Sequence, residues 1–186
     1  MSLVLRWTLL ALAALAVGGC KRCPPPRRPT TAAEAAQVLA NIGREGDARR
    51  LFEFLDQDSR WSMMTIYRDQ RAICSTVRAQ YPKERQAREL QRCSLAERSS
   101  EVGEFFAAYV WAHRLLAPLA KLDPQQAAKA TGDRVELGAQ GSRVTLCRDA
   151  GVFAYCGLRT ELEQLKVKTS RDLETVKENG AAFKAR

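Results

Sequence analysis

The chain contains six cysteines, and their spacing indicates what their thiol groups do. They stand at positions 20, 23, 74, 93, 147 and 156. Zinc sites usually need Cys-x-x-Cys pairs or several histidines, but His113 is the single histidine and no Cys-x-x-Cys occurs after residue 23. Four of the cysteines instead form two close pairs in the sequence, as in disulfide-bonded exported domains. We therefore expect the disulfides Cys74–Cys93 and Cys147–Cys156 and no metal site.

Acid–base chemistry near neutral pH would most simply involve His113, because histidine is the side chain that ordinarily titrates there. It lies in FFAAYVWAHRLLAPLA, residues 105–120, and the chain has no P-loop, G-x-G-x-x-G, G-x-S-x-G or H-E-x-x-H pattern. We assign no catalytic residue and no cofactor, and predict that Tyr109, Trp111 and His113 mark a pocket in a non-catalytic binding domain. The alternative is a small-molecule enzyme that uses the same pocket.

The first twenty residues indicate in which compartment the rest of the chain belongs. Arg6 precedes an apolar run from Trp7 to Val17, which has the length of a signal-peptide core and is short for a membrane span. The run ends in Val17-Gly18-Gly19-Cys20, which resembles the lipobox of bacterial lipoproteins. The resemblance implies that residues 1–19 are removed, that the thiol of Cys20 receives a diacylglycerol, and that fatty acyl chains such as palmitate anchor the protein to a membrane.

Three other interpretations of this segment remain open. A plain secretory signal would release a soluble protein. An uncleaved anchor from Leu3 to Gly19, followed by basic residues, would hold the domain in the cytoplasm by the positive-inside rule. A buried helix of the folded domain would have to turn back at Pro24–Pro26 without a cap or turn. We prefer the lipoprotein interpretation because it accounts for Cys20.

Under that interpretation the protein belongs to the cell envelope and faces the periplasm. Lys21 directly after the anchor would indicate the outer membrane by the sorting pattern of lipoproteins. Residues 20–30 are rich in proline and basic residues and predict an extended spacer. Cys23 in this linker would be free, linked between chains or itself modified.

The chain is basic, with 30 Lys and Arg against 21 Asp and Glu and a formal net charge of +9. Cleavage after residue 19 would remove only Arg6 and leave +8. This excess favours anionic surroundings, such as lipid head groups or acidic polymers of the envelope. Nucleic acid is not an expected partner, because an exported chain seldom meets it. The identity of a protein partner stays open.

Helices dominate the first part of a predicted α+β domain that spans residues 31–158. Thr31 to Glu34 is a capping box, so a helix begins there, and Gly43 is expected to end it. Ser99 or Ser100 is expected to cap a further helix, whose residues 105–120 are apolar on nearly every side and predict a central buried position with a kink near Pro118. Three more helices are predicted: a short one after Gly46-Asp47, one from Ser59 or Ser62 to Tyr81, and one over Lys83–Arg92.

The hydrophobic periodicity of the sequence changes after Gly132 and predicts an antiparallel sheet. Apolar and polar residues alternate over Arg134–Leu137, Arg143–Arg148 and Val152–Leu158, with turn residues between them. A turn at Gly151-Val152 would place Cys147 directly opposite Cys156. The same register predicts one shared opposite face for Val144, Leu146, Phe153 and Tyr155.

Residues 159–186 predict a long C-terminal helix. A second capping box, Thr160 to Glu163, would begin it and Gly180 would end it. Its narrow apolar stripe could dock along the domain or pair with another chain.

The order of these elements, with an aromatic-rich helix before a curled antiparallel meander, resembles the small cone-shaped α+β domains of the nuclear-transport-factor-like superfamily. This resemblance covers residues 31–158 and implies helices that cover a bent sheet and leave a pocket. The chain departs from that pattern in having few strands and an extra terminal helix. A fold of this kind does not by itself determine a function.

Overall fold

The computed structural model describes residues 28–139 and 141–185 and confirms the α+β fold class. The predicted signal segment, the lipobox with Cys20, and Cys23 lie outside the described residues. Within them the chain forms a three-stranded sheet and nine helices, in the order α1 (Ala32–Glu45), α2 (Ala48–Phe54), α3 (Gln57–Gln80), α4 (Lys83–Gln91), α5 (Ser94–Arg98), α6 (Val102–Ala112), α7 (Leu116–Leu119), α8 (Pro124–Ala128), β1 (Arg134–Ala139), β2 (Ser142–Asp149), β3 (Val152–Tyr155) and α9 (Arg159–Lys184).

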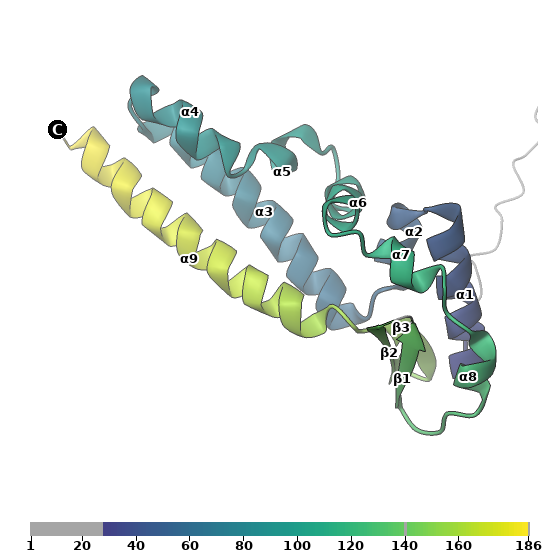
Figure 1. The fold of residues 1–186 in the computed structure, drawn as a ribbon. Coiled ribbons are helices and arrows are strands. Elements are labelled where there is room, and N and C mark those ends of the chain that lie inside the picture. The colour runs from purple at the N-terminus through teal and green to yellow at the C-terminus, as the bar shows by residue number, and fades with distance from the viewer. Residues whose placement is uncertain (1–27, 140, 186) are drawn as a thin grey trace, which may run out of the picture.

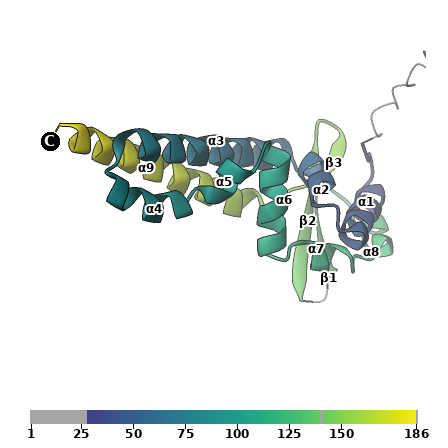
Figure 2. The ribbon, with the colours of Figure 1, turned by 90° about the horizontal axis from the view of Figure 1, so that it is seen from above.

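The molecule has two regions of different shape (Figure 1). One region, here called the body, contains α1, α2, α6, α7, α8 and the sheet; the other, the arm, contains α3 and α9 with α4 and α5 along them. The view from above shows the same division, with the C-terminus at the far end of the arm (Figure 2). The described chain begins at the body, where the backbone amide of Phe153 donates to the carbonyl of Pro29.

The first helix of the body begins as predicted and ends later than predicted. The capping box is present, because the Thr31 side chain accepts from the Glu34 amide while the Glu34 side chain bonds back to the cap. The predicted stop at Gly43 is wrong: α1 runs on to Glu45 and ends at Gly46, which adopts the left-handed conformation. Gly43 serves packing instead, because a Cβ there would lie 2.3 Å from the backbone nitrogen of Ala120 after α7.

The predicted central helix over residues 105–120 is wrong in its extent. Helix α6 ends at Ala112, and Arg114 takes a φ of 55°. The amide of Leu115 then donates to the carbonyl of Val110, which is the bonding pattern of a Schellman motif closed by a residue other than glycine. The break therefore comes before Pro118, and the short helix α7 can turn back to pack on α1.

The sheet is the predicted antiparallel meander in the order β1-β2-β3, but its second hairpin has a different register. The turn consists of Ala150 and Gly151, both with positive φ, as a two-residue hairpin turn requires. Cys147 therefore lies opposite Ala154, and not opposite Cys156 as predicted. Because the observed pairing differs from the predicted pairing by two residues, every side chain stays on its predicted face of the sheet. The core face buries Val135, Leu137, Val144, Leu146, Phe153 and Tyr155.

The arm is built on two helices that leave the body side by side and run in the same direction. Leu55 and Tyr155 form a parallel bridge, and α3 and α9 begin directly after it. The buried carboxylate of Asp56, at the N-terminus of α3, accepts from the Arg159 guanidinium at 2.8 Å. With Asp56 at the cap position, α3 begins at Gln57, before the predicted Ser59 or Ser62.

Helix α9 docks along α3 over most of its length, which is one of the two alternatives that the sequence left open for it. The second predicted capping box is wrong, because Leu158 stands at the cap position and no side chain caps the helix. The predicted stop at Gly180 is also wrong. Gly180 lies inside α9, buried against the side chain of Gln80, where a larger residue would meet the end of α3.

Two apolar clusters hold the described residues together. The larger one fills the body and the base of the arm, with Leu39, Ile66, Phe106 and Leu162 among its fully buried members. The smaller one lies at the far end of the arm and consists of Ile73, Cys74, Val77, Tyr81, Cys93 and Val176, with Leu90, Leu173 and Phe183 packed against it. Among the described helices, none is both long and apolar enough to cross a membrane.

Candidate functional site

Both cysteine pairs expected from the sequence lie at disulfide distance. The Sγ atoms of Cys74 and Cys93 are 1.97 Å apart, and those of Cys147 and Cys156 are 1.93 Å apart. Cys156 lies across from Thr145, whose carbonyl accepts its backbone amide at 3.0 Å, so this link joins β2 and the residue after β3 diagonally. No group of three or more His, Cys, Asp or Glu side chains in the described ranges is arranged to hold a metal ion.

The residues predicted to mark a pocket lie at the C-terminal end of α6. The rings of Tyr109 and His113 are close, with centroids 4.3 Å apart. The Trp111 side chain is 61 % exposed, and the position of its ring is next to Gly46 at the end of α1. His113 is exposed as well. The prediction of a buried apolar helix is therefore wrong at this end: Trp111 and His113 lie on the surface, whereas Tyr109 beside His113 is buried.

Tyr109 has a partner that the sequence did not indicate. Its hydroxyl donates to the carboxylate of Glu161 in the first turn of α9. Burial raises the pKa of Tyr109 well above its ordinary value, and the hydrogen bond to Glu161 raises that pKa further. Because its phenol stays protonated at neutral pH, Tyr109 can act as a hydrogen-bond donor and not as a base. Its contact with Glu161 joins α6 to α9.

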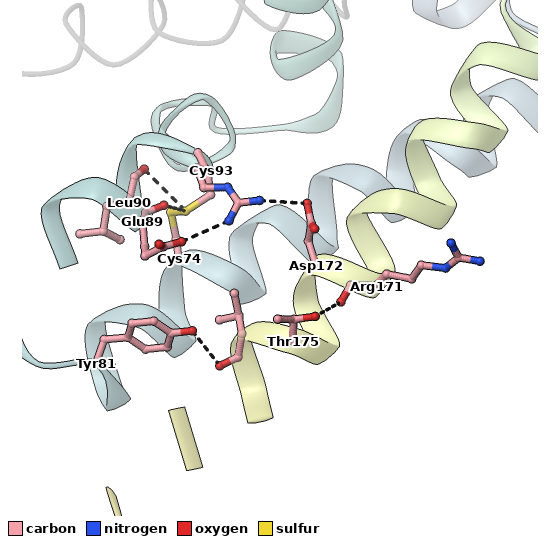
Figure 3. Close-up of polar contacts among 10 residues, drawn as sticks. Cys74, Tyr81, Glu89, Leu90, Cys93, Arg171, Asp172 and Thr175 are labelled. Carbon is pink, nitrogen blue, oxygen red and sulfur yellow. Dashed lines mark hydrogen bonds and ion pairs between the residues drawn. A yellow bond between two sulfur atoms is a disulfide. The ribbon is translucent and has the colours of Figure 1, made fainter. Parts of the chain in front are cut away.

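A groove of about 620 Å³ lies between α4 and α9 on the arm, and Figure 3 shows polar contacts around it. Arg92 lies 3.3 Å from the Glu89 carboxylate and 3.4 Å from that of Asp172. At the end of α3 the Tyr81 hydroxyl donates to the carbonyl of Val176 at 3.2 Å. The Arg92–Asp172 pair links the end of α4 to α9, and the Tyr81–Val176 hydrogen bond links the end of α3 to α9.

The same groove is close to neutral in charge. Its lining includes three arginines and three carboxylates, Arg85, Arg88, Arg92, Glu84, Glu89 and Asp172. The guanidinium of Arg85 lies 5.1 Å from the centre of the Phe183 ring, a cation–π arrangement. Arg92 pairs with two of the three carboxylates, so the formal charges of this lining cancel and the pairs help to hold the end of the arm together.

A second, more open groove of about 760 Å³ lies between α3 and α5, and its charge is different. It is lined by Arg71, Ala72, Ser75, Arg78, Glu97 and Arg98. Three guanidinium groups therefore share it with one carboxylate. We call it the α3–α5 groove.

Sequence reasoning missed this groove because it did not predict α5. Only the short helix over Ser94–Arg98 brings Arg98 to the side of Arg71 and Arg78 on α3. The available signal was the i, i+7 spacing of Arg71 and Arg78, which places both on one side of a helix. Their partner across the groove depends on tertiary structure.

Comparisons with known proteins leave the chain without a relative: no family model, no curated protein and no solved structure matches it. The resemblances to bacterial lipoproteins and to the nuclear-transport-factor-like superfamily stay predictions.

Proposed function

We propose that this chain is a lipid-anchored protein of the bacterial cell envelope, whose folded part acts by binding and not by catalysis. The observation that carries the proposal is the motif Val17-Gly18-Gly19-Cys20 after an apolar run of signal-peptide length. The two cysteine pairs at disulfide distance support it, because disulfides persist in oxidising compartments such as the periplasm.

The arrangement of the described residues is compatible with such an anchor. The described chain starts at the body, where Pro29 bonds to Phe153 of the sheet, and the arm extends to the opposite end of the molecule (Figure 1). With 24 residues, α3 alone is about 36 Å long by the α-helical rise. A protein held through Cys20 would thus keep its body next to the linker and reach outward with the arm. Such a shape favours contact with a partner beyond the anchoring membrane surface.

The mass of the mature amino terminus tests the anchor. We expect the chain expressed in a bacterium with a lipoprotein pathway to begin at Cys20 and to carry a diacylglycerol and further acyl mass. Cys20→Ala should lose that mass and should move from the detergent-rich to the aqueous phase in detergent partition. Full-length protein with Met1 retained, or wild-type protein without acyl mass, would contradict the proposal.

The binding role is tested against the enzyme alternative at His113. Wild-type protein and His113→Gln are assayed with chromogenic acyl and phosphoryl esters, and their melting temperatures are compared. Because His113 is exposed and belongs to an open surface, we expect no turnover in either protein and closely similar melting temperatures. Turnover by wild type that disappears in the variant would favour the enzyme.

A further inference from the structure

The α3–α5 groove has a larger unbalanced positive charge than the groove between α4 and α9. It sets Arg71, Arg78 and Arg98 against one carboxylate, Glu97, whereas the groove between α4 and α9 sets three arginines against three carboxylates. The segment from Arg71 to Arg98 contains seven basic and three acidic residues, a formal excess of four. The lining of the groove itself has a formal excess of two positive charges, and such an excess in a hollow attracts anions.

Most of the donor groups in the α3–α5 groove are not used by the protein. Arg78 lies 2.6 Å from Glu97, which neutralises one guanidinium. Arg71 donates to the Tyr67 hydroxyl, and Arg98 donates through Nε to the carbonyl of Ser94. In the described part of the chain neither Arg71 nor Arg98 has a carboxylate within ion-pair distance. Since each guanidinium has five N–H donors, both keep donors for a ligand.

The walls of the groove are fixed in place. Cys74, next to Ser75 on α3, is bonded to Cys93 directly before α5. At the other end of α5, the carbonyl of Ser99 accepts from the Tyr67 hydroxyl at 2.9 Å. Tyr67 also holds Arg71, whose guanidinium lies 5.6 Å from the centre of its ring. The arginines therefore lose less conformational entropy on binding than free surface side chains would.

We infer that the α3–α5 groove binds a phosphate-bearing anion. The planar fork of a guanidinium matches two oxygens of a phosphate, and Arg71 and Arg98 offer two such forks with the Ser75 hydroxyl between the same walls. A biological role for this binding rests on the proposed function at the envelope. The arm, which contains α3 and α5, extends away from the end where the described chain begins (Figure 2). The binding itself does not depend on acylation of Cys20.

Isothermal titration of the full chain in a nonionic detergent tests the inference, with two probes that separate the sources of phosphate. Pyrophosphate represents a free phosphate, and glycerophosphoglycerol represents a phosphodiester head group. Arg71→Ala/Arg98→Ala removes the two unpaired guanidiniums of the α3–α5 groove. Arg85→Ala/Arg88→Ala removes the same number of charges from the neighbouring groove and is the matched control. Melting temperatures show that each variant is folded.

We expect Arg71→Ala/Arg98→Ala to weaken binding of at least one probe about tenfold or more, since it removes charge-assisted hydrogen bonds. The matched control should change binding less than about twofold, the effect of long-range charge alone. Glu97→Gln should tighten binding, because it releases the guanidinium of Arg78 into the groove.

Each outcome decides the inference. Loss with both probes supports recognition of the phosphate group itself, loss with pyrophosphate alone supports a free phosphate, and loss with glycerophosphoglycerol alone supports a lipid head group. Equal weakening by the two double variants, or no binding by wild type, would overturn the inference. An unacylated chain that binds pyrophosphate would refute only the anchor, and an acylated chain that does not bind would refute only the groove.

Discussion

The body and the end of the arm are held together by different means. The body joins helices and a sheet around one large apolar cluster, to which Leu39, Phe106 and Leu146 contribute fully buried side chains. The arm tip has a cluster of only six buried residues, two of which are the bonded Cys74 and Cys93. Helix α4 has no buried residue at all. Apolar burial can hold the body, whereas the tip depends on a covalent link and on polar contacts.

The interface between α3 and α9 combines apolar burial with polar contacts. Polar contacts that cross it include Asp56 to Arg159 at 2.8 Å, Ser62 to Glu163 at 3.0 Å, and Asp69 to Ser170 at 2.7 Å. Such contacts contribute modest net free energy but are costly to leave unmade. They therefore determine the register of the two parallel helices more than they stabilise the pair.

The difference between the body and the arm tip is tested most directly by replacing an isoleucine with alanine at two positions on α3. Ile66 is fully buried in the body cluster, and Ile73, two turns further, is buried at the arm tip. We expect Ile66→Ala to lower the free energy of unfolding by about 3–5 kcal/mol and Ile73→Ala by about 2 kcal/mol, because the small tip cluster can collapse around the cavity. Urea denaturation measures both. Equal losses of unfolding free energy would contradict the proposed difference between the body and the arm tip.

The Cys74–Cys93 link should matter most for α4. Cys74→Ser/Cys93→Ser opens a loop that closes over 19 residues in sequence, and we expect a loss of about 3 kcal/mol. The loss should be local, because α4 has no apolar burial of its own to hold it. Hydrogen exchange should show fast amides in α4 and unchanged protection in α1. Loss of protection in α1 would show that the tip stabilises the body.

Alanine substitutions at two glycines inside helices should change stability less, and by different amounts. A Cβ at Gly43 would lie 2.3 Å from the backbone of Ala120, which cannot move without displacing α7, so Gly43→Ala should cost about 1–3 kcal/mol. At Gly180 the nearest atom is Oε1 at the flexible end of the Gln80 side chain, with the Gln80 Cβ at 3.0 Å, and alanine gains about 1 kcal/mol of helix propensity that offsets this tighter contact. Gly180→Ala should therefore change the melting temperature very little. A larger loss at Gly180 would show a rigid arm tip.

The smallest effect should appear only at alkaline pH and in the body. Burial, and then the charge of Glu161, raises the pKa of Tyr155 from 10.0 to about 12. Above pH 10 the unfolded chain loses the phenolic proton while the folded chain keeps it, so stability is constant below pH 10 and falls as pH rises toward 12. The slope is on the order of 1 kcal/mol per pH unit.

Tyr155→Phe removes this titration and should make the decline less steep, while the raised pKa of Tyr109 maintains the remaining slope. Melting temperatures between pH 9 and 11.5 measure the difference between the two proteins. Parallel curves for wild type and Tyr155→Phe would show that the pKa of Tyr155 is not raised by folding.

Local patterns in the sequence determined the elements that depend on near neighbours. The capping box at Thr31, the helix after Pro82 and the alternation over β1 to β3 follow from interactions within a few residues, and the structure contains all three. The pairings Cys74–Cys93 and Cys147–Cys156 could also be inferred, because each pair is close in sequence and the elements between them bring the chain back.

Tertiary structure alone decided the features that depend on distant partners. The sequence pattern predicted helix ends at Gly43 and Gly180. Residues of other helices pack on both glycines, and α1 and α9 continue through them. Glu163 was predicted to be part of a cap, but it accepts from Ser62 on α3, far away in sequence. The α3–α5 groove needed Arg98 on a short helix without a clear signal. Local propensities are worth fractions of a kcal/mol per residue, so packing and burial from distant residues can override them.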